Sequence, residues 1–86
     1  MTIQTAIVLA NAFAKDHLKS DYKPEWEGFI DNLTGDCFRT LKHGQSGYVA
    51  FIKQWDGYKG ITKKVIHEFY KACRGVMENA QGIETD

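Results

Sequence analysis

The stretch from Thr62 to Ala80 predicts one amphipathic helix, and this helix limits the possible folds more than any other feature. At 100° per residue, its apolar side chains share one arc and its basic side chains share the opposite arc. The apolar arc contains Val65, Ile66, Phe69, Tyr70, Cys73, Val76, Met77 and Ala80. The basic arc contains Lys63, Lys64, His67, Lys71 and Arg74. The rest of the chain must therefore supply apolar faces that cover the first arc.

Glycines and the single proline divide the preceding sequence into three further segments. The first, residues 2–19, has an apolar stripe made of Ile3, Ala6, Ile7, Ala10, Phe13, Ala14 and Leu18. His17 falls within this stripe, and we expect it at the edge of the core with a hydrogen bond to a carbonyl group. The opposite, solvent side is expected to carry Gln4, Asn11, Lys15 and Lys19.

Pro24 begins the second segment, residues 24–43, because proline is favoured at the first position of a helix. The apolar face of this segment consists of Trp26, Phe29, Ile30, Leu33, Cys37 and Leu41. Its periodicity continues through Gly35. We therefore expect one long helix, with or without a kink at Gly35, although glycine costs about 1 kcal/mol in a helix interior.

The third segment, residues 46–56, is open to two interpretations. Asp56 and Gly57 form a hairpin-turn signal, which would make Tyr48–Trp55 a strand. The apolar residues do not alternate, however, whereas a helix places them on one side with Ser46 as its N-cap. That apolar side would consist of Tyr48, Val49, Phe51, Ile52 and Trp55. Helix is the favoured interpretation.

Together these segments predict an all-α, small single-domain four-helix bundle over residues 1–86. The expected helices are 2–19, 24–43, 46–56 and 62–80, with Thr62 as the N-cap of the last and a frayed tail at 81–86. Trp26 and Trp55 both fall on core faces and need no functional explanation.

Charge is balanced over the whole chain but segregated along it. Eleven basic and eleven acidic residues cancel, which argues against a general electrostatic nucleic-acid binder. Residues 21–36 nevertheless sum to −4 and residues 37–77 to +6. The acidic stretch 25–31 and the basic stretch 63–74 could therefore neutralise each other within one chain or join two copies in a homo-oligomer.

Cysteine use and hydropathy predict a cytoplasmic protein. Cys37 and Cys73 both fall on apolar faces, where free buried thiols in a reducing compartment are expected rather than a disulfide. No run approaches the roughly 18 apolar residues that span a bilayer. The apolar run near the amino end also lacks the basic lead of a signal peptide, so we expect no membrane partner.

Catalytic and metal-binding patterns are not found in the sequence. His17, His43 and His67 have no metal-ligand spacing, and the two cysteines form no CxxC pair. The segment 57–60 lacks the spacing of either nucleotide-binding fingerprint. We therefore expect no enzymatic activity, no cofactor and no metal.

A partner-binding surface is expected where two Tyr-Lys loops would meet at one end of the bundle. Lys63 and Lys64 occupy the first turn of the last helix, although the positive end of a helix prefers acidic residues. Tyrosine anchors with a lysine rim suit an acidic protein surface. The candidate partner-binding residues are Tyr22, Lys23, Tyr58, Lys59, Lys63, Lys64, His67, Lys71 and Arg74.

The expected function is that of a small non-enzymatic regulatory or inhibitory protein, of the kind that phages and plasmids use against a host machine. It would dock on a larger protein with an acidic surface, or on a nucleoprotein complex, and block or modulate it. The alternative is a nucleic-acid-binding module of helix-turn-helix type, which would use the basic arc of helix 62–80.

Overall fold

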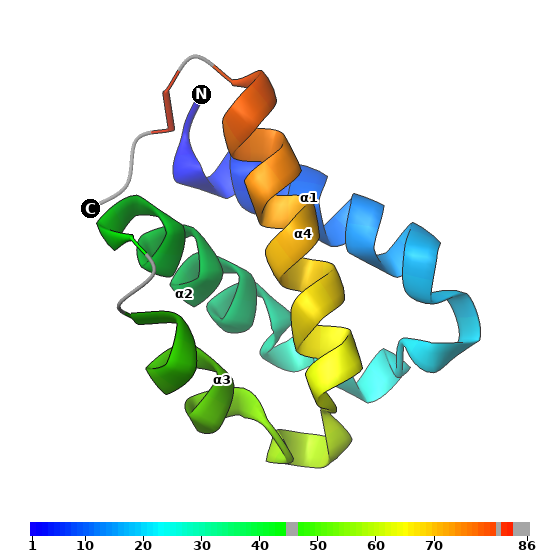
Figure 1. Cartoon of the computed structure of the whole chain (residues 1–86). Coiled ribbons are helices and arrows are strands. Elements are labelled where there is room, and N and C mark those ends of the chain that lie inside the picture. Colours follow the sequence, from blue (N-terminus) through cyan, green and yellow to red (C-terminus); the bar gives the residue numbers. More distant parts are fainter. Residues whose placement is uncertain (45–46, 81, 84–86) are drawn as a thin grey trace.

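The computed structural model describes residues 1–44, 47–80 and 82–83, and these form an all-α domain (Figure 1). Its α-helices are α1 (Ile3–Leu18), α2 (Ile30–His43), α3 (Tyr48–Trp55) and α4 (Lys63–Asn79). Short 3-10 helices η1 (Lys19–Asp21), η2 (Pro24–Gly28) and η4 (Tyr58–Gly60) lie in the connections. Nowhere in the described ranges is there a strand. The predicted four-helix, all-α fold is confirmed.

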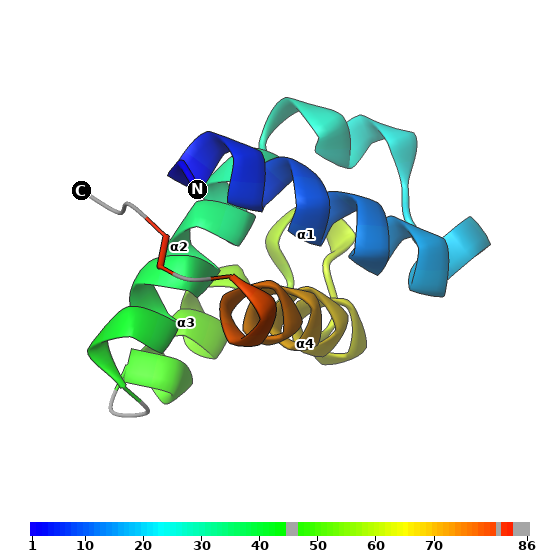
Figure 2. The same ribbon diagram turned by 90° about the horizontal axis from the view of Figure 1, so that it is seen from above.

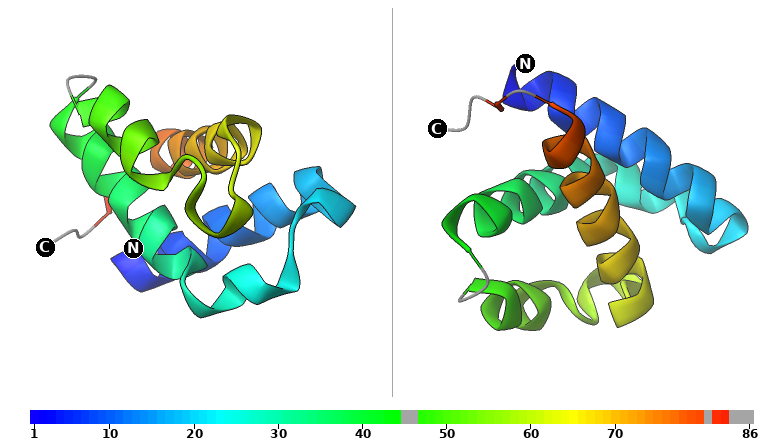
Figure 3. Two further views of the ribbon diagram at one scale, coloured as in Figure 1. Left: turned by 90° about the horizontal axis from the view of Figure 1, so that it is seen from below. Right: turned by 45° about the horizontal axis from the view of Figure 1, so that its top comes forward.

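Helix α4 is the element on which the other three α-helices pack. It crosses α1 rather than running alongside it (Figures 1 and 3). Helix α3 packs mainly on α2, and α1 lies between η2 and α4 in the view from above (Figure 2). The result is an irregular helical domain, because crossing helices bury one short patch of each partner rather than a long parallel seam.

The predicted apolar arc of α4 is confirmed as core. Val65, Ile66, Phe69, Tyr70, Cys73 and Val76 are buried, and Met77 packs against them half-buried. Thr62 caps this helix as predicted, since its hydroxyl accepts a hydrogen bond from the Val65 amide. The largest fully buried side chains elsewhere in the core include Trp26, Phe38 and Leu33.

Most of the predicted apolar stripe of α1 is confirmed, and Ile3 and Ile7 pack against the core. The buried residues of this helix are Ala6, Ala10, Asn11, Ala14 and Leu18. The prediction that Phe13 belongs to the core is wrong, because its side chain is 54% exposed. Small alanines let α4 and α2 approach α1 closely, and a phenylalanine ring does not fit that contact.

The placement of His17 is also corrected. Its side chain is exposed, and its Nδ1 lies 3.8 Å from Oε2 of Glu68 on α4. The expected carbonyl partner at the core edge is not found in the described part of the chain. The histidine therefore lies beside the α1–α4 contact, not within it.

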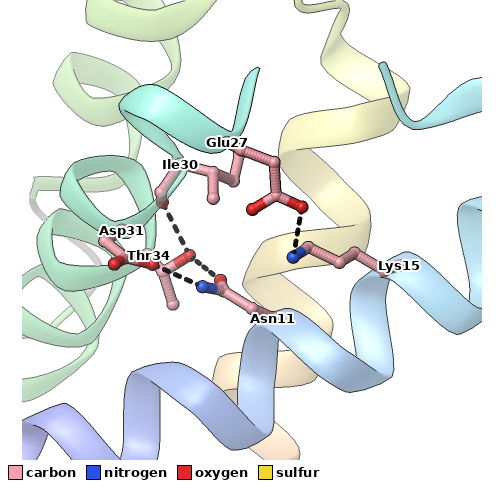
Figure 4. A network of polar contacts seen from close by, with 6 residues as sticks. All are labelled: Asn11, Lys15, Glu27, Ile30, Asp31 and Thr34. Atoms are coloured by element: carbon pink, nitrogen blue, oxygen red, sulfur yellow. Dashed lines mark hydrogen bonds and ion pairs between the residues drawn. The ribbon is translucent and has the colours of Figure 1, made fainter. Parts of the chain in front are cut away.

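Asn11 was expected on the solvent side and instead forms a polar contact between α1 and α2 (Figure 4). Its Nδ2 donates a hydrogen bond of 2.8 Å to Oδ1 of Asp31. Its Oδ1 accepts a hydrogen bond from the buried hydroxyl of Thr34, whose single proton is shared with the Ile30 carbonyl 3.0 Å away. Buried polar groups need such partners, so this network fixes how α1 sits on α2.

The expected single helix over residues 24–43 is wrong, because the chain breaks at Phe29. Residues 24–28 form the 3-10 helix η2, and Phe29 has φ −136° and ψ −3° before α2 begins. A straight helix would turn Trp26 and Phe29 toward one neighbour. The break lets Phe29 stack on Trp55, with ring centres 6.1 Å apart. Gly35 is buried within α2 and does not interrupt it.

The third segment is a helix, as the favoured interpretation predicted, and the strand alternative is excluded. Its predicted N-cap Ser46 lies outside the described residues. Phe51 and Trp55 are buried, whereas Val49 is 61% exposed, so its assignment to the apolar side is wrong. Of the segment 81–86, the structure describes residues 82–83. Ile83 packs against the core, and the Gly82 carbonyl accepts a hydrogen bond from the Met1 ammonium group.

Candidate partner-binding surfaces

The first and third loops meet at one end of the domain, which we call the lysine-rich end after Lys23, Lys59, Lys63 and Lys64. The indole Nε1 of Trp26 donates a hydrogen bond of 2.8 Å to the Lys59 carbonyl. The Nζ atom of Lys23 also lies close to Gly60, 3.3 Å from the position that a Cβ on this glycine would occupy. Lysines from three separate segments thus converge on one region.

The loop at residues 57–60 has an unusual backbone. Gly57 and Gly60 have φ +86°, and Lys59 between them has φ +52°. Glycine adopts this left-handed conformation freely, but a residue with a Cβ does so at a cost of roughly 1 kcal/mol. The hydrogen bond from Trp26 holds the Lys59 carbonyl in place. The loop therefore has a defined shape despite its exposure.

The two loop tyrosines differ in accessibility. Tyr58 is 45% exposed, and its ring packs edge-on against Phe29 and Trp55, with centres 5.0 and 5.5 Å away. Tyr22 is half-buried and packs edge-on against Trp26 at 5.5 Å. Burial, followed by the charge of Glu27, raises the pKa of Tyr22 far above its usual value. Tyr58 is thus available to a partner, while Tyr22 mainly covers the end of the core.

A hollow of about 320 Å³ opens between η1, η2 and the start of α4, and Asp21, Lys23 and Lys64 are its charged lining. Lys64 pairs with Asp21 at 2.9 Å, and this hydrogen bond raises the pKa of Lys64. Lys63 is exposed and has no ion-pair partner within the described ranges. The first turn of α4 contains no acidic residue, so the helix dipole adds to the positive potential.

The remaining members of the basic arc lie further along α4. Lys71 pairs with Glu68 on its own helix at 3.2 Å. The Arg74 guanidinium lies 5.8 Å from the centre of the Tyr70 ring. With His67 and Tyr48, these last two residues line a hollow of about 230 Å³. Lys64, Lys71 and Arg74 are therefore already engaged within the chain.

The acidic stretch 25–31 contacts α1 (Figure 4). Glu27 pairs with Lys15 at 2.8 Å, and that hydrogen bond lowers the pKa of Glu27. Asp31 accepts the hydrogen bond from Asn11. Both carboxylates therefore take part in contacts between elements of one chain.

Sequence reasoning missed a second surface, on the outer side of α1. Val8 is 66% exposed, Leu9 is 37% exposed and Phe13 is 54% exposed. A groove of about 250 Å³ runs beside Phe13, between α1 and α4. The signal was present in the sequence, since Val8 and Leu9 lie outside the predicted apolar stripe and make this helix apolar on more than one side.

No family model, curated protein or solved structure matches this chain. In the part of the chain that the structure describes, none of the helices is both long and apolar enough to cross a bilayer.

The buried cysteines are free, as predicted, and they face the α2–α4 contact. The Cys37 thiol lies 3.9 Å from the Phe69 carbonyl, and the Cys73 thiol lies 3.9 Å from the Thr34 carbonyl. Burial raises the pKa of Cys73, so this thiol stays protonated and weakly nucleophilic. Among the described residues, no group of three or more His, Cys, Asp or Glu side chains is placed to hold a metal ion.

Proposed function

We propose that this protein is a non-enzymatic regulatory protein that docks through its lysine-rich end on an acidic surface of a larger protein. The observation that supports this most directly is the gathering of lysines around residues 57–60, where Tyr58 is exposed. Lys59 Nζ lies 5.9 Å from the centre of the Tyr58 ring, and Lys23 and Lys64 line one hollow with Gly60. In the bound state the tyrosine ring is the anchor and the lysines pair with carboxylates around it. Docking of a rigid domain of this size blocks or modulates the covered site.

The shape of the loop at residues 57–60 supports the same proposal. Lys59 keeps a left-handed backbone that glycine would adopt without strain. Such strained positions cluster where proteins bind or react. A loop that already has its bound shape loses little conformational entropy on association, which favours affinity.

The positive potential predicts how such a complex forms. Complementary charges mainly accelerate association and select the partner, and salt screens them over about 10 Å at 0.1 M. We therefore expect binding that slows as ionic strength rises but persists, because the Tyr58 contact is apolar. This behaviour suits an inhibitor that must find one target among many proteins.

Nucleic acid is the second candidate partner, and one observation favours it. His67 and Arg74 lie with Tyr48 and Tyr70 around one hollow on α4. Basic and aromatic groups side by side are typical of surfaces that bind single-stranded nucleic acid. Binding of this kind would use the basic arc of α4 and would weaken steeply with salt.

The deciding experiment is affinity capture from a lysate, with and without nuclease, followed by mass spectrometry. The key variant is Lys63→Glu, and Lys53→Glu on α3 is its control, since both residues are exposed and both changes alter net charge equally. An acidic residue in the first turn of α4 stabilises the helix by about 0.3–1 kcal/mol. Loss of capture by Lys63→Glu therefore cannot be attributed to unfolding.

We expect the same protein to be captured by the wild type and the Lys53→Glu variant in both nuclease arms, and to be lost with Lys63→Glu. Equal capture by all three chains would refute docking through the lysine-rich end. Capture that disappears only after nuclease treatment would instead identify nucleic acid as the ligand.

A further inference from the structure

The side of α1 that faces away from the core carries six residues that form one surface, which we call the outer stripe. Its members are Thr5, Val8, Leu9, Ala12, Phe13 and Asp16, and all of them are exposed. No other helix covers α1 in the view from above (Figure 2). The inner side of the helix buries Ala6, Ala10, Ala14 and Leu18, whereas Val8, Leu9 and Phe13 lie on its outer side. A contiguous group of exposed apolar side chains is typical of an interaction surface.

The outer stripe has an internal symmetry. About the midpoint between residues 10 and 11, the position of Thr5 mirrors that of Asp16, Val8 mirrors Phe13, and Leu9 mirrors Ala12. An antiparallel copy of α1, related by a two-fold axis at that midpoint, therefore meets the stripe with the same stripe. Leu9 then lies at the level of Ala12 of the partner subunit, so that a large side chain meets a small one. Val8 and Phe13 widen this apolar contact on its two sides.

Charge agrees with the same antiparallel arrangement. The first turn of α1 contains no acidic residue, so the positive end of its dipole is uncompensated within the helix. Asp16 is exposed near the other end and has no ion-pair partner within the described ranges. The two-fold axis places Asp16 beside Thr5 of the partner subunit, at that positive end. This favourable contact occurs twice in the pair.

The groove beside Phe13 has room for a side chain from outside. Ala14, Ala72 and Gly75 are among its lining residues. Gly75 lies inside α4, where glycine is less favourable than alanine. A Cβ added there would meet nothing within 4 Å, so packing within the single chain does not require this glycine. The open space is available to a second molecule that covers the outer stripe.

We propose that the occupant of this surface is a second copy of the chain, in an antiparallel two-fold dimer formed by the outer stripes of α1. The self-complementary spacing and charge of the stripe favour a copy over a different protein. The lysine-rich end lies outside this interface. Each dimer would therefore present two docking ends, and a failure of the dimer leaves the proposed docking function untouched.

The test is the mass of the purified chain in solution, measured by sedimentation equilibrium from roughly 1 µM to 1 mM. The variant Leu9→Glu buries charge at the centre of the interface. Its control is Val49→Glu, which replaces an exposed apolar side chain that lies on α3, away from the outer stripe. We expect twice the single-chain mass for the wild type and Val49→Glu, and the single-chain mass for Leu9→Glu. Circular dichroism checks that all three chains remain helical.

A second variant tests the antiparallel direction. Asp16→Lys places a positive charge at the positive end of the partner's helix, twice per dimer, and should raise the dissociation constant roughly tenfold. A wild-type chain that stays single over the whole concentration range would overturn the proposal and leave the outer stripe to a different protein. Equal masses for Leu9→Glu and Val49→Glu would overturn it as well.

Discussion

Replacing Asn11 with aspartate should make the stability of this domain depend on pH in a new way. Asn11 is buried, donates to the Asp31 carboxylate at 2.8 Å and accepts from the Thr34 hydroxyl. Aspartate has nearly the same shape, but its ionised form cannot donate to Asp31. It would place a second carboxylate within hydrogen-bond distance of the first. Burial and the neighbouring charge would both raise the pKa of the new carboxyl group.

The direction and size of the effect follow from this raised pKa. A carboxyl group whose folded pKa exceeds its unfolded value destabilises the fold above the folded pKa, and the penalty disappears as pH falls below the unfolded value. A rise of about 2 units corresponds to about 2.7 kcal/mol at neutral pH, at 1.36 kcal/mol per unit. For a domain of this length that should lower the midpoint of thermal unfolding by more than about 10 °C.

Thermal unfolding followed by circular dichroism at pH 7 and pH 4 measures this effect. The control is Asn11→Ala, which loses the same two hydrogen bonds without adding a charge and should cost about 2 kcal/mol at both pH values. Relative to the wild type, the penalty of Asn11→Asp should largely vanish at pH 4, whereas that of Asn11→Ala should not. Equal pH dependence of the two variants would refute the assignment of Asn11 to a buried contact with Asp31.

Two further predictions concern stability alone. Gly35→Ala should stabilise the domain by about 0.5–1 kcal/mol, because the added Cβ would make ordinary contacts of 3.7 Å with Ile7 and Arg39; a lower urea midpoint would contradict the described packing. Glu27→Gln should destabilise the domain at neutral pH but not well below the usual pKa of glutamate. Its pairing with Lys15 lowers the Glu27 pKa, so the contribution exists above that range and is lost on acidification. A urea-midpoint difference between wild type and Glu27→Gln that persists in acid would contradict this.

The sequence predicted α4 well because its apolar and basic residues separate into two arcs, which leaves one register for burial. Helix α1 is different, since Val8, Leu9 and Phe13 make it apolar around much of its circumference. Periodicity placed most of the buried side correctly but could not show that Phe13, at the edge of the stripe, is exposed. The alanines are buried there because α4 crosses at close range, and that crossing is a property of the assembled domain.

The break at Phe29 could not be predicted from the sequence, for a related reason. Trp26 and Phe29 share one face of an ideal helix, and Pro24 is a good helix start, so local rules favour a continuous helix. The contacts that break it are made with Lys59 and Trp55, far along the chain. Tertiary packing of large aromatic rings outweighs local helix preference here.

The proximity of the two Tyr-Lys loops could be predicted because short connections bring alternate loops of a helical domain to one end. The outer stripe could not be found by the same method, since exposed apolar residues have meaning only once the core is assigned. Tyr22 illustrates the limit. Its place in a loop left open whether the ring faces a partner or folds back over the end of the bundle, and the structure packs it against the core.

The hydrogen bond from Trp26 to the Lys59 carbonyl joins groups that are 33 residues apart in the chain. This hydrogen bond can form only after α2 and α3 have brought the two segments together, so the geometry of the lysine-rich end depends on the folded domain. Binding of a partner at this site is therefore coupled to folding of the domain. Whatever binds there stabilises the whole domain by mass action, and a partner should raise the unfolding temperature even though it touches only one end.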